Sequence, residues 1–242
     1  MKTKKSAVRV CIILPTWNEA TVIGQVIADV IKALKTSSYS GTVLVVNDGS
    51  RDDSSAIARN HDAVVIDHIL NTGQGGAVAT GLRYADQNGF DIAVTMDADG
   101  QHDIKDALRG VDELIKRGDD LLIGSRLIDK KGMSKVKILG NKGLSFTTYI
   151  LFGVYTTDSQ SGLRVFSRRA VEQLRWKANR YEFCSEMLWR AKQLDLKIGE
   201  FPIKAIYTDY STSSARVAGQ NNWNGVNIVK NLIRHRIVEM FE

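Results

Sequence analysis

Short apolar runs alternate with segments of helical periodicity through the first half of the chain. Residues 8–14 form a β-rich run that ends at Pro15, and apolar residues between 22 and 34 then recur at helical spacing. The first pattern predicts a buried strand and the second an amphipathic helix. Strands that alternate with helices indicate an α/β fold, in which helices cover both faces of a mostly parallel sheet. By the same patterns we predict strands at 42–46, 63–66, 92–96 and 120–123, and helices at 53–60, 76–87 and 104–115.

Polar side chains follow the ends of several of these strands. Glu19 comes after the first strand, Asp48 closes the second, and Asp97 and Asp99 close the strand at 92–96. Ligands of open α/β sheets bind beyond the carboxyl ends of the strands. The pattern therefore predicts a functional site at this edge of the sheet.

The second half of the chain is less regular. Residues 133–154 mix lysines with apolar residues, and residues 158–167 have the character of a loop that enters a strand. Residues 184–194 have helical periodicity. Residues 197–206 predict one or two edge strands, in which Pro202 limits ladder pairing.

The tail of the chain predicts one more helix, at residues 223–241, with a single apolar face. No composition shift marks a linker before it. We therefore expect one domain at residues 1–206. A C-terminal helical appendage at residues 207–242 would pack on that domain, on a membrane or on a partner.

The composition narrows the class of protein. With 242 residues, of which 43% are hydrophobic, the chain is long enough to bury a sizeable core. Two cysteines exclude a disulfide scaffold and favour a reducing compartment. The apolar runs are far shorter than the ~18 residues of a membrane span, and the start does not resemble a secretory signal. We therefore expect a cytoplasmic protein, and the net charge of +6 favours anionic partners such as nucleotides, phosphates or acidic lipid head groups.

Asp97 and Asp99 place two carboxylates on the same side of an extended backbone. Mg²⁺ and Mn²⁺ prefer such oxygen ligands and complete their coordination with substrate phosphate oxygens. An isolated pair with this spacing is more often a solvated Asx turn. Here Glu19 and Asp48 are expected at the same edge, where mutually repelling carboxylates favour a bound cation. We therefore predict a divalent metal site, and we interpret the neighbouring His102 as a loop residue rather than a ligand.

Five segments occur together in the order typical of one enzyme family. They are ILPTWNEA at 13–20, VVNDGSRD at 45–52, NTGQGGAVATGL at 71–82, DADGQH at 97–102 and GSR at 124–126. Together they resemble the family-2 glycosyltransferases of the GT-A fold, a Rossmann-like α/β architecture. The later segment DSQSGLRVFSRRAV at 158–171 is similar to the dolichol-phosphate mannosyltransferase branch and its bacterial polyprenyl-phosphate relatives. The resemblance extends to about residue 206.

The resemblance implies a nucleotide site at the edge of the sheet. Asp48 would accept an N–H of the base, and the residues around it that resemble the nucleoside-binding edge are Pro15, Thr16, Trp17 and Glu19. The segment that contains Asn71 and Gly75 would line the pocket, and its glycines would allow close backbone approach. The residues alone leave open whether Trp17 stacks on a base or covers the end of the sheet. Asn47 replaces the first acid of the common D-D-G-S motif, while Asp48 remains in place.

The resemblance also implies sites for a metal ion and for phosphates. The implied ligands of Mg²⁺ or Mn²⁺ and the diphosphate are Asp97, Asp99 and Gln101. The implied ligands of donor or acceptor phosphate are Arg126, Ser161 and Arg164. Ordinary surface ion pairs are the alternative interpretation of the two arginines. Gln74 stands where relatives often carry lysine, which removes one cation from the expected phosphate contacts.

The expected enzyme is a metal-dependent inverting hexosyltransferase that moves a sugar from a nucleoside-diphosphate sugar to a polyprenyl or dolichyl phosphate. The metal ion and Arg126 would stabilise the departing diphosphate. A phosphate acceptor is already anionic and attacks directly. A saccharide hydroxyl, as in cell-wall or capsule synthesis, needs a base, for which Asp158 is the candidate. Residues 133–154 and the C-terminal helix are candidates for a peripheral contact with the cytoplasmic membrane face, with the covering of a core or a dimer partner as the alternative.

Two other functions compete with this hypothesis. A sugar-phosphate nucleotidyltransferase needs an N-terminal glycine-rich loop with arginine and lysine, and residues 15–20 do not resemble one. A non-catalytic nucleotide-sugar-binding module has no reason to keep two mutually repelling acids at positions 97 and 99. Nucleic acid is not an expected partner. The nucleoside, the sugar and the oligomeric state, including a homo-oligomer, are left open by the sequence.

Overall fold

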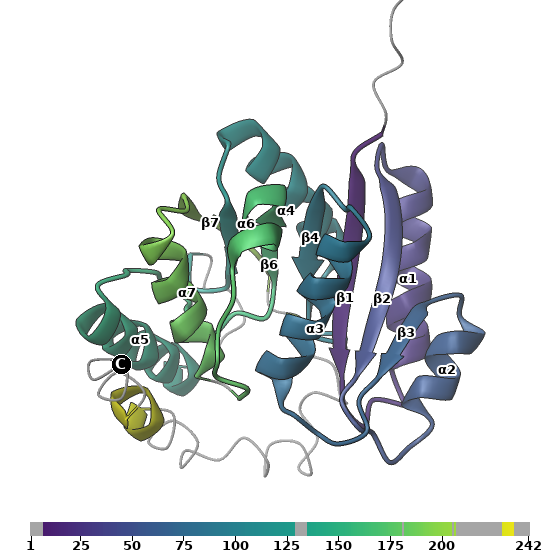
Figure 1. The fold of residues 1–242 in the computed structure, drawn as a ribbon, viewed down its shortest axis with the longest axis horizontal. Helices are drawn as coiled ribbons and strands as arrows, with labels where there is room; N and C mark the ends of the chain where they lie inside the picture. Colours follow the sequence, from purple (N-terminus) through teal and green to yellow (C-terminus); the bar gives the residue numbers. More distant parts are fainter. Residues whose placement is uncertain (1–6, 129–134, 181, 205, 207–228, 235–242) are drawn as a thin grey trace, which may run out of the picture.

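A computed structural model describes residues 7–128, 135–180, 182–204, 206 and 229–234, and its strands form one seven-stranded sheet (Figure 1). The order across the sheet is β3-β2-β1-β4-β6-β5-β7. β6 pairs antiparallel with β4 and β5, whereas the other pairs are parallel. The strands are β1 (Arg9–Thr16), β2 (Ser40–Asn47), β3 (Val64–Asp67), β4 (Ile92–Thr95), β5 (Leu121–Ser125), β6 (Arg164–Ser167) and β7 (Ile198–Pro202).

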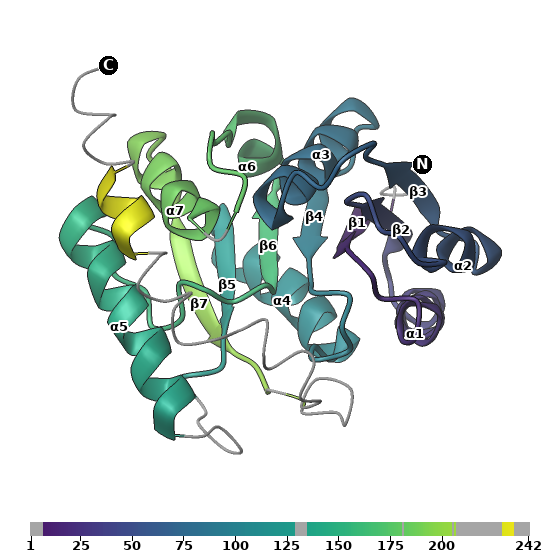
Figure 2. The same cartoon turned by 90° about the horizontal axis from the view of Figure 1, so that it is seen from below.

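Helices cover both faces of this sheet (Figure 2). The first face carries α1 (Ile23–Thr36), α2 (Ser54–Asn60) and α4 (Ile104–Arg117). The second face carries α3 (Gln74–Gln87), α6 (Arg168–Gln173) and α7 (Phe183–Gln193). α5 (Lys135–Phe152) packs against α7 at the side of the molecule away from α1.

Two apolar cores lie on the two sides of the sheet because side chains alternate along each strand. On β1, Val10, Ile12 and Leu14 face the core under α1 and α4, whereas Cys11 and Ile13 face the core under α3, α6 and α7. All five side chains are fully buried. Burial raises the pKa of the Cys11 thiol to about 12, so this cysteine behaves as an unreactive core residue.

α4 shows how local sequence sets the ends of an element. Asp103 precedes the helix, and its side chain accepts a hydrogen bond from the Lys105 N–H at 2.9 Å. Gly118 follows the helix with φ 61°, and its N–H donates to the Leu114 carbonyl. An acidic N-cap and a left-handed glycine are the usual helix start and stop signals. They hold α4 directly after the loop that carries Asp97 and Asp99.

The predicted α/β architecture with a mostly parallel sheet is confirmed. Every strand and helix predicted before residue 125 is present, with ends within two residues of the prediction. Of residues 133–154, Lys135–Phe152 form the helix α5, and the described part of 197–206 contains one edge strand, β7. The sequence did not predict α6, which is only six residues long.

The structure describes only part of the predicted C-terminal helix. Residues 229–234 are helical, and the rest of the predicted helix at 223–241 lies outside the described residues. The division at residue 206 therefore stays a prediction. None of the helices in the described part of the chain combines the length and the apolar character that a membrane crossing requires.

Candidate active site

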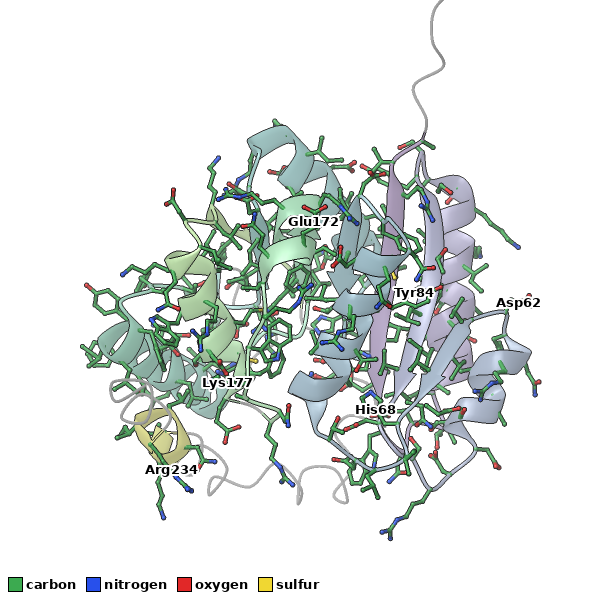
Figure 3. All side chains as sticks on the ribbon, in the orientation of Figure 1. Asp62, His68, Tyr84, Glu172, Lys177 and Arg234 are labelled. Carbon is green, nitrogen blue, oxygen red and sulfur yellow. The ribbon has the colours of Figure 1, made fainter. Side chains whose placement is uncertain are left out.

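Asp48 anchors the loop that connects β3 to α3. Its Oδ1 accepts hydrogen bonds from the N–H and hydroxyl of Thr72 at 2.8 and 2.7 Å, and its Oδ2 accepts one from the Gly73 N–H at 2.7 Å. His68 Nδ1 lies 2.8 Å from Oδ1, and Figure 3 shows His68 at the lower edge of the sheet. Burial raises the pKa of Asp48, but the hydrogen bonds from Thr72, His68 and Gly73 outweigh it and hold the pKa below its ordinary value.

The glycine-rich turn after this loop packs against the chain's own backbone. A Cβ at Gly73 would collide with the carbonyl oxygen of Asn179, and a Cβ at Gly75 would collide with that of Ala178. The Gly75 N–H also donates to the Asn179 carbonyl at 2.8 Å. Gly73 has φ +96°, which favours glycine. The glycines therefore permit a close approach between two segments of the chain, and their role toward a nucleotide stays a prediction.

Glu186 of α7 fixes residues 177–178, next to which the glycine-rich turn packs. Its carboxylate is fully buried and accepts hydrogen bonds from the Lys177 N–H at 2.9 Å and the Ala178 N–H at 2.7 Å. Trp176 Nε1 donates to the Gly75 carbonyl at 3.1 Å. α7 thereby fixes the glycine-rich turn at the start of α3 and, through it, the position of Gln74.

Asp97 lies where three segments of the chain meet. Gln74 Nε2 donates to Asp97 Oδ1 at 2.7 Å, and His102 Nε2 lies 3.3 Å from Oδ2. Burial raises the pKa of Asp97, but His102 and the positive charges of Arg126 and Arg164 together hold the pKa below its ordinary value. The carboxylate is therefore ionised at neutral pH, as a ligand of a divalent cation must be.

Asp99 follows two residues later, and its Oδ1 accepts a hydrogen bond from the Gln101 N–H at 3.0 Å. This is the Asx-turn geometry expected of a D-x-D loop. On the other side of Asp97, the backbone of Gly162 lies so close that a Cβ there would collide with the carboxylate. His102 is buried, and its Nδ1 has no hydrogen-bond partner among the residues that the structure describes.

A bidentate ion pair joins Arg126 and Asp158. Arg126 Nε donates to Oδ2 at 2.7 Å, Nη2 donates to Oδ1 at 2.9 Å, and the backbone N–H donates to Oδ2 at 3.2 Å. The Asp158 side chain is fully buried, and that of Arg126 is 20% exposed. Since both carboxylate oxygens receive hydrogen bonds from Arg126, Asp158 orients the guanidinium. Its role as a base stays a prediction.

Glu200 of β7 fixes the segment that carries Asp158. Its Oε1 accepts hydrogen bonds from the Thr157 N–H at 2.8 Å and from the Thr157 hydroxyl at 3.0 Å. Thr157 Oγ1 also lies 2.6 Å from Ser125 Oγ at the end of β5. Burial and the charge of Asp158 raise the pKa of Glu200, and the hydrogen bonds from Thr157 offset only part of that rise. The ion pair thus rests on two strands of the sheet.

Arg164 and Ser161 lie inside the protein. Arg164 is 2% exposed, its Nη2 donates to the Ser159 carbonyl at 2.8 Å, and its guanidinium carbon lies 5.4 Å from the centre of the Phe183 ring. Its Nε has no hydrogen-bond partner in the described part of the chain. The Ser161 hydroxyl is buried and accepts a hydrogen bond from the Leu163 N–H at 3.3 Å. The positive charge of Arg164 therefore lowers the pKa of Asp97 without a direct hydrogen bond in the structure. A direct contact of Arg164 or Ser161 with a phosphate stays a prediction.

The predicted nucleoside edge adjoins Asp48. Pro15 and Thr16 end β1, and the Thr16 carbonyl accepts a hydrogen bond from the Asp48 N–H at 2.8 Å. Trp17 is 54% exposed, which leaves its ring accessible to a ligand. Glu19 is buried, and its N–H donates to Ser54 Oγ at 2.8 Å. These nucleoside-binding roles stay predictions.

Because of the strand order, the predicted residues lie at one edge of the sheet. The segment 72–74 connects the Asp48 side of the candidate site to the Asp97 side, because Thr72 and Gly73 bond to Asp48 while Gln74 bonds to Asp97. The predicted residues that follow strand ends or enter β6 at this edge are Asp48, Asn71, Gly75, Asp97, Asp99, Gln101, Arg126 and Asp158.

Sequence reasoning missed several residues that position the site. His68 and Thr72 bond to Asp48, Glu200 bonds to Thr157, and Glu186 bonds to residues 177–178 in the loop before its own helix. No spacing or periodicity marks these residues, because their partners are set by strand order or by the path of a loop. The available signal was that Thr72 lies within the glycine-rich segment 71–82 and that His68 shortly precedes this segment.

The acidic pair suits a metal ion that is shared with a substrate. No group of three or more carboxylate, histidine or cysteine side chains forms a metal site among the described residues. Asp97 and Asp99 supply two carboxylates, and Gln101 supplies an amide oxygen nearby. Mg²⁺ is commonly held by one or two carboxylates together with substrate phosphates, so this donor set fits such an ion.

Comparisons with known proteins agree with this geometry. Residues 11–175 match glycosyl transferase family 2. The chain is 41% identical over 224 residues to the UDP-N-acetylglucosamine–dolichyl-phosphate N-acetylglucosaminyltransferase of Methanococcus voltae, with 83% of this chain and 86% of the relative covered. It is 27% identical over 231 residues to the polyprenol monophosphomannose synthase of Mycolicibacterium smegmatis, with 90% of this chain and 84% of the relative covered.

Among solved structures, the chain is similar to glucosyl-3-phosphoglycerate synthase from Mycobacterium tuberculosis in complex with Mn²⁺, UDP-glucose and phosphoglyceric acid. The TM-score is 0.66 at 19% identity, with 96% of this chain and 80% of that chain covered. This likeness confirms the GT-A type of fold. The match over residues 11–175 shows that the chain is a member of glycosyl transferase family 2, and hence a glycosyltransferase.

Proposed function

We propose that this glycosyltransferase moves a sugar from a nucleoside-diphosphate sugar to a polyprenyl phosphate, with inversion at the anomeric carbon and with Mg²⁺ or Mn²⁺. The observation that carries the proposal is the shared edge of the sheet, where the Asp97–Asp99 pair lies in the field of the fixed cation Arg126. The names of the relatives from Methanococcus voltae and Mycolicibacterium smegmatis support the choice of acceptor.

The metal ion would be held by Asp97 and Asp99 with Gln101, and it would neutralise charge that develops on the departing diphosphate. Gln74 and His102 orient the Asp97 carboxylate from two sides. A neutral amide at position 74 leaves the carboxylate charge available, where a lysine would neutralise it. These contacts keep the acidic pair in place before a substrate arrives, which reduces the reorganisation that binding requires.

The donor nucleoside would bind beside Asp48. The loop at 68–73 is tied to the Asp48 carboxylate, and Trp17 offers an accessible ring on the neighbouring loop. Pro15, Thr16 and Glu19 would line the site between them, and the lining would continue through Asn71 and Gly75. An apolar ring beside polar backbone groups is suited to a nucleoside, which has an aromatic face and a polar edge.

The acceptor phosphate would bind to Arg126. A phosphate oxygen attacks the anomeric carbon while the bond from that carbon to the diphosphate breaks, and the configuration inverts. The attacking oxygen is already anionic, so no protein base has to remove a proton. The engagement of both Asp158 oxygens by Arg126 favours this acceptor over a saccharide hydroxyl.

A peripheral contact with a lipid surface accompanies this acceptor. α5 carries exposed large apolar side chains at i, i+7 and i+11, where Leu139 is 74%, Phe146 62% and Ile150 63% exposed. An amphipathic helix lies in a membrane interface with its apolar face down. This face of α5 is continuous with the loop that leads to Asp158, so it would bring the site to the membrane surface.

The test is release of nucleoside diphosphate from sugar nucleotides in the presence of a polyprenyl phosphate and Mn²⁺. Asp99→Ala is expected to lower the rate by about 100-fold or more, because it removes stabilisation made at the leaving group. Glu172→Ala serves as control, since Glu172 is an exposed residue of α6 away from the lower edge (Figure 3). Wild-type protein that releases no diphosphate from any common sugar nucleotide would contradict the proposal.

A further inference from the structure

Gly162 lies against the Asp97 carboxylate in the turn that enters β6. Apart from its own chain neighbours, the three atoms nearest to a Cβ at this position are the two oxygens and the carboxyl carbon of Asp97, and all three would collide with it. The φ angle of Gly162 lies outside the left-handed region, so the backbone conformation itself does not require a glycine. The missing side chain therefore makes room for the carboxylate and not for a turn.

The backbone at Gly162 is fixed on both sides. Its carbonyl accepts a hydrogen bond from the Thr95 hydroxyl of β4 at 3.0 Å. The next carbonyl, that of Leu163, accepts one from the Gly124 N–H of β5 at 2.9 Å. Two strands thus hold this turn, whereas a carboxylate can rotate about single bonds. A side chain at position 162 would therefore displace the Asp97 carboxylate more easily than the backbone.

The Asp97 carboxylate is restricted on three sides and is still accessible. Gln74 donates to Oδ1, His102 Nε2 lies 3.3 Å from Oδ2, and Gly162 covers one face. The side chain of Asp97 is nevertheless 31% exposed, which leaves access for a cation.

A carboxylate with a fixed orientation discriminates between divalent ions. Mg²⁺ requires near-ideal octahedral geometry with oxygens at about 2.0–2.1 Å, whereas Ca²⁺ accepts about six to eight oxygens at about 2.3–2.6 Å in flexible arrangements. Rotation of one carboxylate should therefore cost the smaller ion more affinity than the larger one.

We infer that Gly162 is a positioning residue whose missing side chain sets the orientation of Asp97, and thereby the preference of the site for Mg²⁺ and Mn²⁺ over Ca²⁺. This inference rests on the proposed function and adds a determinant of ion selectivity to it. Gly162 has no side-chain atom to offer as a ligand, so it acts on the ion only through Asp97.

Direct ion binding tests this inference without turnover. Mn²⁺ is titrated into the full chain, and the enhancement of water proton relaxation reports the bound ion. UDP is present throughout as a source of diphosphate oxygens, and Mg²⁺ and Ca²⁺ are added as competitors. Gly162→Ala is expected to weaken Mn²⁺ and Mg²⁺ by about 10-fold, as changes beside a metal ligand commonly do, and Ca²⁺ by less than about threefold. The ratio of the Mg²⁺ and Ca²⁺ affinities is a readout that a loss of stability alone would not move.

Gly110→Ala is the matched control. A Cβ at Gly110 would meet the Phe201 ring at 2.6 Å and the Val165 side chain at 2.9 Å, in the core under α4 and without contact to Asp97. This variant is expected to lower the melting temperature, as overpacking does, and to leave all three ion affinities unchanged.

Thr95→Val acts on the same turn without adding a side chain to it. It removes the hydroxyl that holds the Gly162 carbonyl and keeps the shape of the side chain. We expect it to lower the ratio of the Mg²⁺ and Ca²⁺ affinities by about threefold, because the turn can then move against the carboxylate. If Gly162→Ala does not fold, this variant decides alone, and an unchanged ratio overturns the inference.

The outcomes separate this inference from the proposed function. Gly162→Ala that binds all three ions like wild type, or loses them in equal proportion, overturns the inference even if the enzyme transfers sugar with Mn²⁺. A selective loss of Mg²⁺ and Mn²⁺ supports it even if no sugar nucleotide releases its diphosphate, in which case the proposed function fails alone. Wild-type protein that binds no Mn²⁺ overturns the inference together with the metal requirement of the proposed function.

Discussion

The Arg126–Asp158 pair shows how one buried carboxylate orients a partly buried cation. Asp158 is fully buried and engages Arg126 through both oxygens, so the guanidinium has one orientation in the part of the chain that the structure describes. A bidentate pair adds geometric specificity that a point charge lacks. At the scale of single residues, the site therefore depends on geometry as much as on charge.

Arg126→Lys tests this dependence on geometry. Lysine keeps the charge but cannot donate two parallel hydrogen bonds to Asp158. We expect the kcat/KM for the phosphate acceptor to fall by about 10- to 100-fold, with the KM for the sugar nucleotide within about twofold of wild type. Steady-state kinetics with each substrate varied in turn measure both values. A change confined to the donor KM would contradict the assigned position of Arg126.

Asp67 gives a prediction for pH. Burial raises its pKa, but hydrogen bonds from Arg59, Ser55 and Asn47 outweigh it and lower the pKa to about 2. The pKa of an unfolded aspartate is about 4, so this residue stabilises the fold above about pH 4 and loses that contribution as pH falls toward about 2. Because the side chain is 41% exposed, the contribution is expected to be at most about 1 kcal/mol.

Asp67→Asn is therefore expected to lose less stability than wild type between about pH 4 and pH 2. Urea unfolding over that range measures the difference. Glu172→Gln, at an exposed carboxylate, serves as the control and is expected to follow wild type. Parallel curves for wild type and Asp67→Asn would show that Asp67 does not contribute in this way.

At the scale of elements, α7 controls the glycine-rich turn at the start of α3. Glu186 fixes residues 177–178, and the carbonyls of Ala178 and Asn179 leave no room for a Cβ at Gly75 or Gly73. The position of Gln74 beside Asp97 follows from this packing. A single methyl group at the turn should therefore affect both stability and the acidic pair.

Gly75→Ala is expected to lower the free energy of unfolding by about 1–3 kcal/mol, because its Cβ meets a backbone carbonyl that cannot move easily. Gly140→Ala makes the same change inside α5, where, apart from the backbone of the helix itself, no atom of the described residues lies within 4 Å of the added Cβ. That control is expected to raise the free energy of unfolding by about 0.5–1 kcal/mol, since alanine favours a helix. Denaturant unfolding compares the two, and equal effects would refute the packing argument.

The strand ends of the site were predictable from the sequence, whereas the pairing of β6 was not. Strand ends such as Asp48 and Asp97 were predictable, because apolar runs and turns are local and parallel strands end at one edge. The burial of Arg164 was not predictable. It follows from the insertion of β6, in reverse, between β4 and β5, and no local pattern specifies that pairing. The bond of Glu200 to Thr157, 43 positions away in the chain, likewise depends on strand pairing that no local pattern specifies.

At the scale of the whole molecule, the proposed contact with a lipid surface rests on basic charge and on one apolar helix face. The net charge is +6, and α5 exposes apolar side chains, of which Phe146 lies near Leu127 and Thr157, the chain neighbours of Arg126 and Asp158. Attraction to anionic lipids adds to the burial of apolar surface in such contacts. The site and the surface thus share one side of the protein.

Leu139→Asp and Ile150→Asp are each expected to weaken binding to vesicles with anionic lipids by about 10-fold, because a charge replaces an exposed apolar side chain that the membrane would bury. Ile115→Asp on α4 provides the matched control with the same charge. Vesicle co-sedimentation measures the affinities. If all three variants lose affinity equally, net charge rather than the α5 face accounts for the binding.

Residues 72–74 connect the proposed base-binding and metal-binding sides of the site, so the two sides should influence each other when the enzyme binds its donor. The backbone N–H groups of this stretch bond to Asp48 at one end, and the side-chain amide of Gln74 bonds to Asp97 at the other. A ligand that shifts this stretch cannot do so on one side only. We therefore expect the affinities for base and for divalent ion to be mutually dependent, each altering the other by the same factor.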